Sequence, residues 1–471
     1  MSSPTIPEEI LEAFQKQFGF ALLIKGTAGT GKTTLALEIL SRAKNPIYIS
    51  TRVSPEFLYE QFPWVADFLN PSNIYDATQT YFPTITQTQT QRFKVFKYSD
   101  VPNFIEIIFE HFQGVEEPTI VIDSWNAVIG YRLPQDVQEE KFSNLITELV
   151  RKTNIKLVLV AENPEISFLD YLVDGVIITH DLRVENRRAR VMELLKMRSI
   201  PIKQPYYTYT LDSGRFKLFP LYKFQFPSIL LKPEPLPDPH KDFISTGILD
   251  LDTVFGGGLR KGSVYLFEVA HGVGDGYLNF IIPLFTNQLN SGRGVILILP
   301  EGYSAKSFNL VQENFVDREQ FLKQFISFER LNESQKPEEK SYIQPLNNRI
   351  DITFQQIWEK AKNLKNNNFG PIVYFLGLDK LENTYEEMEI IRALSDHMAH
   401  IKGSEGDITV ILAREGQNLI DKISHMADNH WKVRLLNKAL VIYGVQPESE
   451  FWLVANDTSR GYVSLNLTPV V

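Results

Sequence analysis

Cysteine is absent from the 471 residues of the chain. This absence excludes disulfide bonds and thiolate metal ligands at once. An apolar run of about 18 residues, the length a membrane-spanning helix needs, is also missing. The stretch MSSPTIPEEILEAF at the start has neither the basic region nor the apolar region of a secretory signal. Together these absences predict a cytoplasmic protein.

Positive charge is in deficit, since 48 Lys and Arg face 57 Asp and Glu, which gives a formal net charge of −9. This balance argues against a surface that coats nucleic acid. One basic stretch, Arg183 to Arg198 (RVENRRARVMELLKMR), could still contact nucleic-acid phosphates or an acidic partner. It has no aromatic residues for base stacking and also carries Glu185 and Glu193. We therefore favour an exposed hairpin of alternating charge, without excluding nucleic acid.

The length of the chain predicts two domains of about 200 residues or more. The segment KPEPLPDPH, Lys232 to His240, has four prolines in nine residues. Proline lacks an amide donor and pushes its predecessor into extended geometry, so this segment suits neither a helix nor a central strand. We predict a first domain over residues 1–231, a semi-rigid linker over 232–240 and a second domain over 241–471.

Short apolar runs alternate with helix-like segments in both halves. In the first half they cover residues 21–26, 47–51, 119–124, 156–161 and 175–180. In the second half runs at 264–269, 294–300, 371–378, 408–413 and 439–445 recur in the same order. Nearly unbroken apolar runs are typical of parallel strands buried on both faces. The sequence predicts a duplication, with each half a doubly wound α/β domain.

A complete phosphate-binding motif, GTAGTGKTT, follows the first predicted strand and opens a predicted helix. It fits G-x-x-x-x-G-K-[ST] in the strand–loop–helix context that a P-loop requires. The glycines let backbone amides turn toward phosphates, and the helix amino terminus adds positive potential. Lys32 is expected to reach the β- and γ-phosphates of ATP. The predicted ATP contacts of the loop are Gly26, Thr27, Ala28, Gly29, Thr30, Gly31, Lys32, Thr33 and Thr34.

A metal site is predicted beside this loop. Asp123 ends the third predicted strand, TIVIDS. A carboxylate at the carboxyl edge of such a sheet can hold Mg²⁺ through water, while the P-loop hydroxyl, here of Thr33, joins the metal shell. The order of these residues favours this interpretation over an aspartate that merely begins a loop. We expect Thr33 and Asp123 to form the Mg²⁺ site.

The second half opens with STGILDLDTVFGGGLRKGSVYLFEV, residues 245–269. This stretch resembles the start of a KaiC-like domain of the RecA-type ATPases. The first half resembles the same family in its P-loop, its IDS strand and LLKMRS, residues 194–199. The resemblance implies two tandem RecA-like domains and a homo-oligomer in which Lys196 and Arg198 project toward a neighbouring subunit's nucleotide. A strand with two solvated cations is an equally good interpretation of these two residues.

One stretch, STRVSPEF, departs from this family. KaiC-like ATPases place two adjacent glutamates here, where they polarise the attacking water. Aligning SPE on SPE puts Arg52 and Val53 at those positions, and neither can act as a general base. Hydrolysis is therefore expected to be slow or absent, unless Glu162 after the fourth predicted strand substitutes. Arg52 is expected instead to pair with the γ-phosphate and to distinguish ATP from ADP.

The loop HGVGDGYLN of the second half has the outline of a P-loop without its chemistry. With the glycines in register, Tyr277 replaces the lysine and Leu278 the threonine. Gly377 falls at the position of the metal-site aspartate, with Asp379 two residues further on, and Glu301 is the one survivor of the glutamate pair. We predict that the second domain is a pseudo-ATPase with a structural or partner-binding role.

The P-loop, the STRVSP departure and the two-half layout together resemble the gas vesicle protein D family of archaeal regulators. This resemblance implies an ATP-binding protein whose nucleotide state controls engagement of a protein partner such as a transcription regulator. Two alternatives stay open. One is an active RecA-like ATPase of DNA recombination or repair, and the other is a non-catalytic structural assembly protein.

Overall fold

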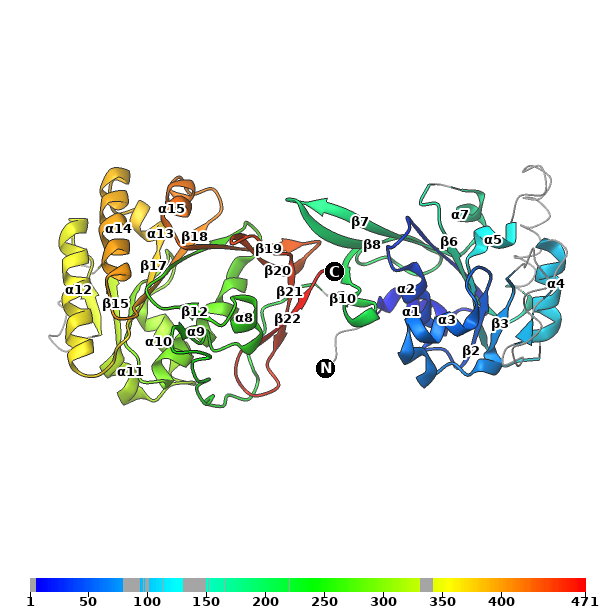
Figure 1. Cartoon of the computed structure of the whole chain (residues 1–471), viewed down its shortest axis with the longest axis horizontal. Coiled ribbons are helices and arrows are strands. Elements are labelled where there is room, and N and C mark those ends of the chain that lie inside the picture. Colours follow the sequence, from blue (N-terminus) through cyan, green and yellow to red (C-terminus); the bar gives the residue numbers. More distant parts are fainter. Residues whose placement is uncertain are drawn as a thin grey trace. The chain divides into compact units, whose positions relative to one another are not determined.

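The computed structural model describes residues 6–78, 94–95, 97, 101–112, 114–129, 150, 152–165, 167–219, 221–330 and 342–471. The chain forms two compact units. The first comprises Met1–Pro220 together with Pro469–Val471, and the second comprises Leu221–Thr468 (Figure 1). In the structure, the division thus falls before the Pro-rich segment, which belongs to the second unit.

The first unit is built on a ten-stranded mixed sheet of order β10-β9-β8-β7-β1-β6-β5-β2-β3-β4. The strands from β7 through β1 to β4 run parallel, and β7 to β10 are antiparallel to one another. Their bounds are β1 Phe20–Gly26, β2 Asn45–Ser50, β3 Ile74–Asp76, β4 Lys94–Val95, β5 Pro118–Asp123, β6 Lys156–Ala161, β7 Gly175–Val184, β8 Arg187–Met197, β9 Tyr206–Thr210 and β10 Lys217–Phe219.

Helices cover both faces of this sheet because its central strands are apolar on both sides. In β1, Leu22 and Ile24 pack with α1 and α2, whereas Ala21 and Leu23 pack on the other face with α4 and α5. The helices are α1 Glu8–Lys16, α2 Lys32–Leu40, α3 Pro55–Gln61, α4 Val101–Phe112, α5 Trp125–Ile129 and α7 Phe168–Leu172, with 3₁₀ turns at Pro63–Asp67, Pro71–Asn73 and Asp212–Gly214.

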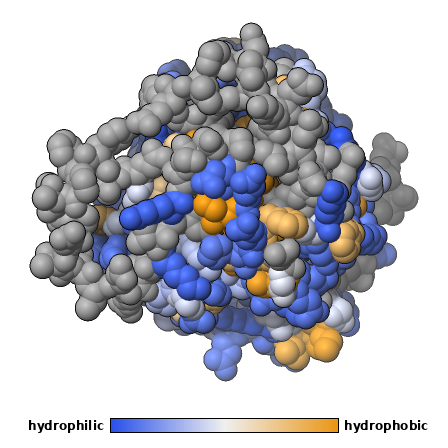
Figure 2. Space-filling model, turned by 90° about the vertical axis from the view of Figure 1, so that its right-hand side faces the viewer, coloured by the Kyte–Doolittle hydropathy of each residue, from blue (hydrophilic) through white to orange (hydrophobic). Residues whose placement is uncertain are grey.

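Figure 2 shows a face of the first unit, the one that lies at the right of Figure 1. The described residues on this face are mostly hydrophilic, and the apolar ones form small groups. Scattered apolar residues of this kind are normal for a surface in contact with water.

The second unit repeats this plan on a ten-stranded sheet of order β16-β15-β14-β17-β18-β13-β19-β20-β21-β22. The strands are β13 Val264–Val269, β14 Val295–Ile298, β15 Phe325–Glu329, β16 Ile343–Pro345, β17 Val373–Gly377, β18 Ile408–Arg414, β19 Asn429–Leu436, β20 Ala439–Gln446, β21 Trp452–Asp457 and β22 Ser464–Pro469. A small separate sheet pairs β11 Phe243–Ile244 with β12 Leu259–Arg260.

The two sheets share one central order, β19-β13-β18-β17-β14 in the second unit against β7-β1-β6-β5-β2 in the first. Both sheets are mixed and mainly parallel, which confirms the predicted α/β class. The predicted correspondence between the fifth apolar runs of the two halves, residues 175–180 and 439–445, is wrong by one strand. The counterpart of β7 is β19, which pairs parallel with β13, and residues 439–445 lie in the antiparallel β20.

Two apolar cores flank the second sheet. Tyr265 and Phe267 of β13 pack on the side of α9, whereas Val264 and Leu266 pack on the side of α12 and α14. Among the described residues, no helix is both long enough and apolar enough to cross a membrane. The helices are α8 Leu249–Val254, α9 Leu278–Asn290, α10 Ala305–Gln312, α11 Arg318–Gln324, α12 Ile350–Asn366, α13 Leu378–Glu382, α14 Glu387–Lys402 and α15 Ile420–Met426, with a 3₁₀ turn at Gly274–Tyr277.

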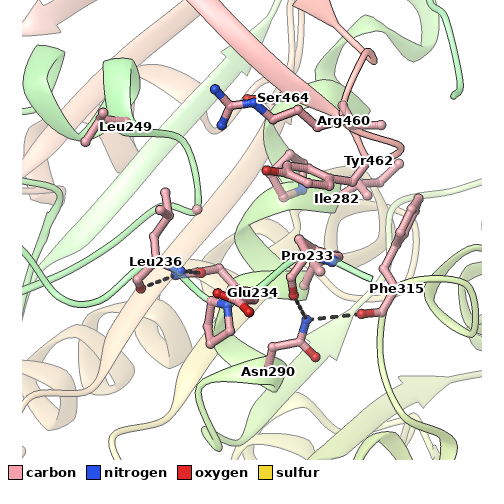
Figure 3. Close-up of a pocket in the computed structure, with 16 residues that line it drawn as sticks. Pro233, Glu234, Leu236, Leu249, Ile282, Asn290, Phe315, Arg460, Tyr462 and Ser464 are labelled. Carbon is pink, nitrogen blue, oxygen red and sulfur yellow. Dashed lines mark hydrogen bonds between the residues drawn. The ribbon is translucent and has the colours of Figure 1, made fainter. Parts of the chain in front are cut away.

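The Pro-rich segment is held against α9 of the second unit. The Leu236 amide donates to Asn287 Oδ1 over 2.7 Å, and Asn290 Nδ2 donates to the Pro233 carbonyl over 3.2 Å. Figure 3 shows the latter bond at the edge of a pocket that Phe315 and Tyr462 also line. Proline removes amides from this segment, so its remaining backbone groups are met by asparagine side chains.

Candidate nucleotide-binding site

The loop GTAGTGKTT joins β1 to α2, as the motif predicts. Gly31 precedes the helix with φ of 80°, and a Cβ there would lie 2.6 Å from the Leu211 side chain, so glycine is required. Within the described part of the chain, no group accepts a hydrogen bond from the backbone amides of Thr27 to Gly31. A row of amides without a protein acceptor at a helix amino terminus fits the phosphate oxygens of a nucleotide.

Lys32 is folded back onto this loop. Its Nζ donates to the Thr27 carbonyl over 2.7 Å, and only 9% of the residue is exposed. Burial lowers the pKa of Lys32, and the nearby charge of Asp123 opposes that shift. Because this buried ammonium donates to a neutral carbonyl, a phosphate anion beside it would form a stronger, charge-assisted hydrogen bond.

The two predicted metal-site residues lie together at the carboxyl edge of the sheet. Thr33 Oγ1 donates to Asp123 Oδ2 over 2.6 Å, and the Tyr48 hydroxyl donates to the same oxygen over 3.0 Å. Burial raises the pKa of Asp123, while both hydroxyl donors hold it down. A carboxylate and a hydroxyl in contact fit the oxygen coordination of Mg²⁺. When bound there, the ion would neutralise charge on the β- and γ-phosphates.

Arg52 and Val53 follow β2 at the same edge. The guanidinium of Arg52 donates from Nη1 to Glu162 Oε1, and the two side chains are 54% and 42% exposed. The Val53 side chain is exposed, and its carbonyl accepts from Ser50 Oγ over 2.5 Å. The candidate base Glu162 is therefore paired with a cation, and Val53 brings no proton acceptor to the site on its side chain.

Two further residues hold the loop from the hairpin side, and the motif did not reveal them. Arg190 Nη1 donates to the Gly29 carbonyl over 3.0 Å, and the Tyr209 hydroxyl donates to the Thr30 carbonyl over 2.6 Å. Arg190 is only 5% exposed, although it belongs to the basic stretch predicted to be a solvated hairpin. The hairpin exists as β7 and β8, but this arginine points inward. Its position in the alternating pattern of β8 was the available signal.

Lys196 lies further along β8, Arg198 directly follows that strand, and both are engaged within their own unit. Lys196 Nζ donates to the carbonyls of Asp170 and Val173 over 2.9 and 2.7 Å. Arg198 Nη1 pairs with Asp174 Oδ1 over 2.9 Å. The structure does not bring either residue to the P-loop of the same chain, so a role toward a neighbouring subunit stays a prediction.

In the second unit the space equivalent to the P-loop is filled by the protein itself. Tyr277 ends the 3₁₀ turn before α9, is 4% exposed and packs edge-on against Tyr303. Leu278 begins α9 in place of the threonine. Gly377 ends β17, and a Cβ there would lie 2.7 Å from the Pro300 nitrogen. A metal-binding carboxylate has no room at that position.

Carboxylates around this second loop are already occupied. Glu301 Oε2 pairs with Lys380 Nζ over 2.9 Å, and Asp379 Oδ2 pairs with Arg414 Nε over 3.3 Å. The amide of His271, in the loop itself, donates to Glu415 over 2.8 Å. A loop whose amide faces a carboxylate repels phosphate, so this arrangement opposes nucleotide binding.

Comparison with known protein families gives a separate match for each half of the chain. The family model "GvpD gas vesicle protein, P-loop domain" matches residues 10–198, and "GvpD basic region 2" matches residues 232–471. The chain belongs to the GvpD family. Among GvpD relatives it is 25% identical to Protein GvpD2 of Halobacterium salinarum, covering 99% of this chain and 96% of that protein. It is 23% identical to Protein GvpD1 of the same organism over the same shares.

This GvpD chain is also distantly similar to the clock ATPases. It is 24% identical to the circadian clock oscillator protein KaiC of Parathermosynechococcus lividus, over 54% of this chain and 47% of that protein. The similarity confirms the KaiC-like character inferred from the sequence. The P-loop match identifies this GvpD protein as nucleotide-binding.

Proposed function

We propose that this GvpD protein binds ATP with Mg²⁺ in its first unit and hydrolyses it slowly or not at all. Its nucleotide state then controls engagement of a protein partner, such as a transcription regulator, in a process related to gas vesicles. The second unit contributes a surface rather than a second site. One observation carries the proposal: a complete P-loop is combined with Arg52 and Val53 at the two positions where KaiC-like ATPases have adjacent glutamates.

The chemistry of the site supports retention of ATP over its turnover. The loop amides, Lys32 and the Thr33–Asp123 pair suit a magnesium-bound triphosphate. A positioned general base typically contributes about 10²–10⁴-fold in rate. The remaining candidate, Glu162, follows β6, two strands away from β2, after which the pair of glutamates is expected. A site of this kind acts as a slow switch whose lifetime is set by nucleotide exchange.

Replacing Lys32 tests the binding step. We expect Lys32→Ala to abolish ATP binding in titration calorimetry with Mg²⁺, because the variant loses the cation nearest the phosphates. Lys44→Gln is the matched control. Lys44 directly precedes β2, at the end of the strand away from Arg52, and its Nζ forms an exposed ion pair with Glu116 over 2.7 Å. Unchanged affinity in Lys32→Ala would refute the assignment of the site.

The regulatory step has a separate test. Turnover by the wild type should be far below that of an ordinary P-loop ATPase and should not rise with single-stranded DNA. Partners retained from native lysate should differ between ATP-loaded and ADP-loaded protein. Rapid DNA-stimulated turnover would favour the recombination alternative, and an identical partner set would favour a structural assembly role.

A further inference from the structure

Glu162 lies closer to the phosphate loop than its distance along the chain suggests. It directly follows Ala161, the last residue of β6, which pairs with Lys25 of β1. Glu162 is therefore level with Gly26, where the P-loop begins. Its backbone is fixed from the other side, since the Glu162 amide donates to Asn126 Oδ1 over 2.8 Å. This carboxylate stands at the sheet edge between the P-loop strand and the strand of the metal-site aspartate.

Arg52 reaches the same place from two strands away. The preceding residue, Thr51, donates its amide to the Asp123 carbonyl over 2.9 Å, so Arg52 leaves the sheet beside β5. To meet Glu162 its side chain must cross β5, because the order is β6-β5-β2. Through this contact with Glu162 the guanidinium lies next to the end of β1, where the P-loop begins.

The ion pair is of a kind that an incoming anion can displace. Both side chains are about half exposed, and exposed pairs contribute little because water screens them. A terminal phosphate offers the guanidinium more negative charge and two parallel oxygens, a stronger match than one carboxylate oxygen. ADP lacks that group, so only ATP can compete for Arg52.

We propose that Arg52 is shared between Glu162 and the γ-phosphate: without ATP the guanidinium is bound by Glu162, and on ATP binding it passes to the γ-phosphate and releases the carboxylate. The inference rests on the proposed nucleotide site and specifies how that site is read. The exchange leaves a free carboxylate beside Gly26 only in the ATP state. Arg52 is then the residue that distinguishes ATP from ADP. Glu162 competes with the γ-phosphate for Arg52 and so lowers the affinity for ATP.

The test is a titration of the full chain with Mg²⁺ and either the slowly hydrolysed analogue ATPγS or ADP. We expect Arg52→Gln to lose affinity for ATPγS by roughly 10- to 100-fold, the usual range for one charged hydrogen-bonded contact. Its affinity for ADP should be unchanged. Glu162→Gln should bind ATPγS about two- to fivefold more tightly, because the competing surface pair is gone.

The double variant separates competition from unrelated local effects. In Arg52→Gln the Glu162→Gln change should no longer affect ATPγS binding, since the two effects depend on one contact. Lys44→Gln, which breaks another exposed pair, should leave both affinities unchanged. Thermal unfolding of each variant checks that the fold is intact, as expected for exposed positions.

Three outcomes would overturn the inference. Equal loss of ATPγS and ADP affinity in Arg52→Gln would make Arg52 a general phosphate contact. No loss of ATPγS affinity would remove it from the site, and an additive double variant would remove the exchange. In each of these cases Lys32→Ala still abolishes binding and the proposed function stands. Wild-type protein that binds neither nucleotide, or a Lys32→Ala variant that binds normally, overturns both.

Discussion

At the scale of the residue, Asp123 carries a conflict between binding and stability. Burial raises its pKa above the ordinary value of 3.8. Between the unfolded and the raised folded pKa, the folded state binds more protons, so the free energy of unfolding falls as the pH rises through that window. At neutral pH the ionised carboxylate therefore destabilises the protein that has no metal bound.

Asp123→Asn should accordingly raise the melting temperature of the metal-free protein at pH 7, by about 2–4 °C for each kcal/mol gained. The asparagine oxygen can still accept from Thr33 and Tyr48. The same variant should lose the Mg²⁺-dependent part of ATP binding. Asp67→Asn, at an exposed position, is the control. A lower melting temperature at pH 7 in Asp123→Asn would show that its charge is stabilised by the fold.

The position of the P-loop could be predicted because the motif is continuous in sequence, and the loop joins β1 to α2 as expected. The strand pattern likewise placed Asp123 at the end of β5, whereas the nucleotide and metal roles of these residues stay predictions. Arg190 and Tyr209 could not be assigned in this way. Their contacts with Gly29 and Thr30 exist only after the β8–β9 pair has folded beside the loop. The alternation along β8 could indicate that Arg190 points inward, but a single sequence does not show which distant residue it meets.

At the scale of the element, His397 joins α14 to its neighbours. Its Nδ1 accepts from Trp358 Nε1 of α12 over 3.1 Å, and its Nε2 lies 2.9 Å from Thr409 Oγ1 of β18. This geometry uses the neutral ring. Burial, assisted by the charge of His400, lowers the pKa of His397 to about 3.

Acid should therefore weaken this packing. Between pH 6.5 and about 3 the unfolded state binds a proton that the folded state does not. The free energy of unfolding therefore decreases as the pH is lowered, by up to about 1.4 kcal/mol per pH unit. We expect His397→Gln to flatten the pH dependence of urea unfolding between pH 7 and 4. His425→Gln, on an exposed face of α15, should leave the slope as in the wild type. An unchanged slope in His397→Gln would contradict the assignment of the neutral ring.

Strands buried on both faces were the elements that the sequence predicted well. The apolar runs of β1, β5, β6, β13 and β18 match the structure to within one residue at each end. β19 was missed because its segment, NHWKVRLL, alternates apolar and charged residues. A parallel strand half exposed to water has no unbroken apolar run, so the next one along the chain was matched instead.

At the scale of the whole molecule, we expect one nucleotide site, and we expect it in the first unit. The full chain with Lys32→Ala should show no ATP-dependent thermal stabilisation in Mg²⁺, because the loop of the second unit has Tyr277 and Leu278 in place of the P-loop lysine and threonine. The wild type should gain about 2.7 kcal/mol at a ligand concentration 100 times Kd. Stabilisation that persists in Lys32→Ala would place a nucleotide in the second unit.

The packing of the Pro-rich segment could not be predicted from its composition. Four prolines predicted a semi-rigid linker over residues 232–240, and in the structure Asn287 and Asn290 form hydrogen bonds with the backbone of this segment. The return of Pro469–Val471 to the first unit likewise has no local signal. Segment composition predicts backbone shape and does not predict where the segment packs.

Gly377 restricts which residues the second unit can accept at the end of β17. A side chain at this position meets the backbone of Pro300 at 2.7 Å, and main chain yields far less readily than a flexible side chain. Introducing an aspartate there by a single point mutation would thus disrupt the end of β17 before any metal could bind. A change that moves the neighbouring chain would have to come first, and it would bring no benefit of its own. A single mutation therefore does not give the second unit a metal-binding carboxylate at this position.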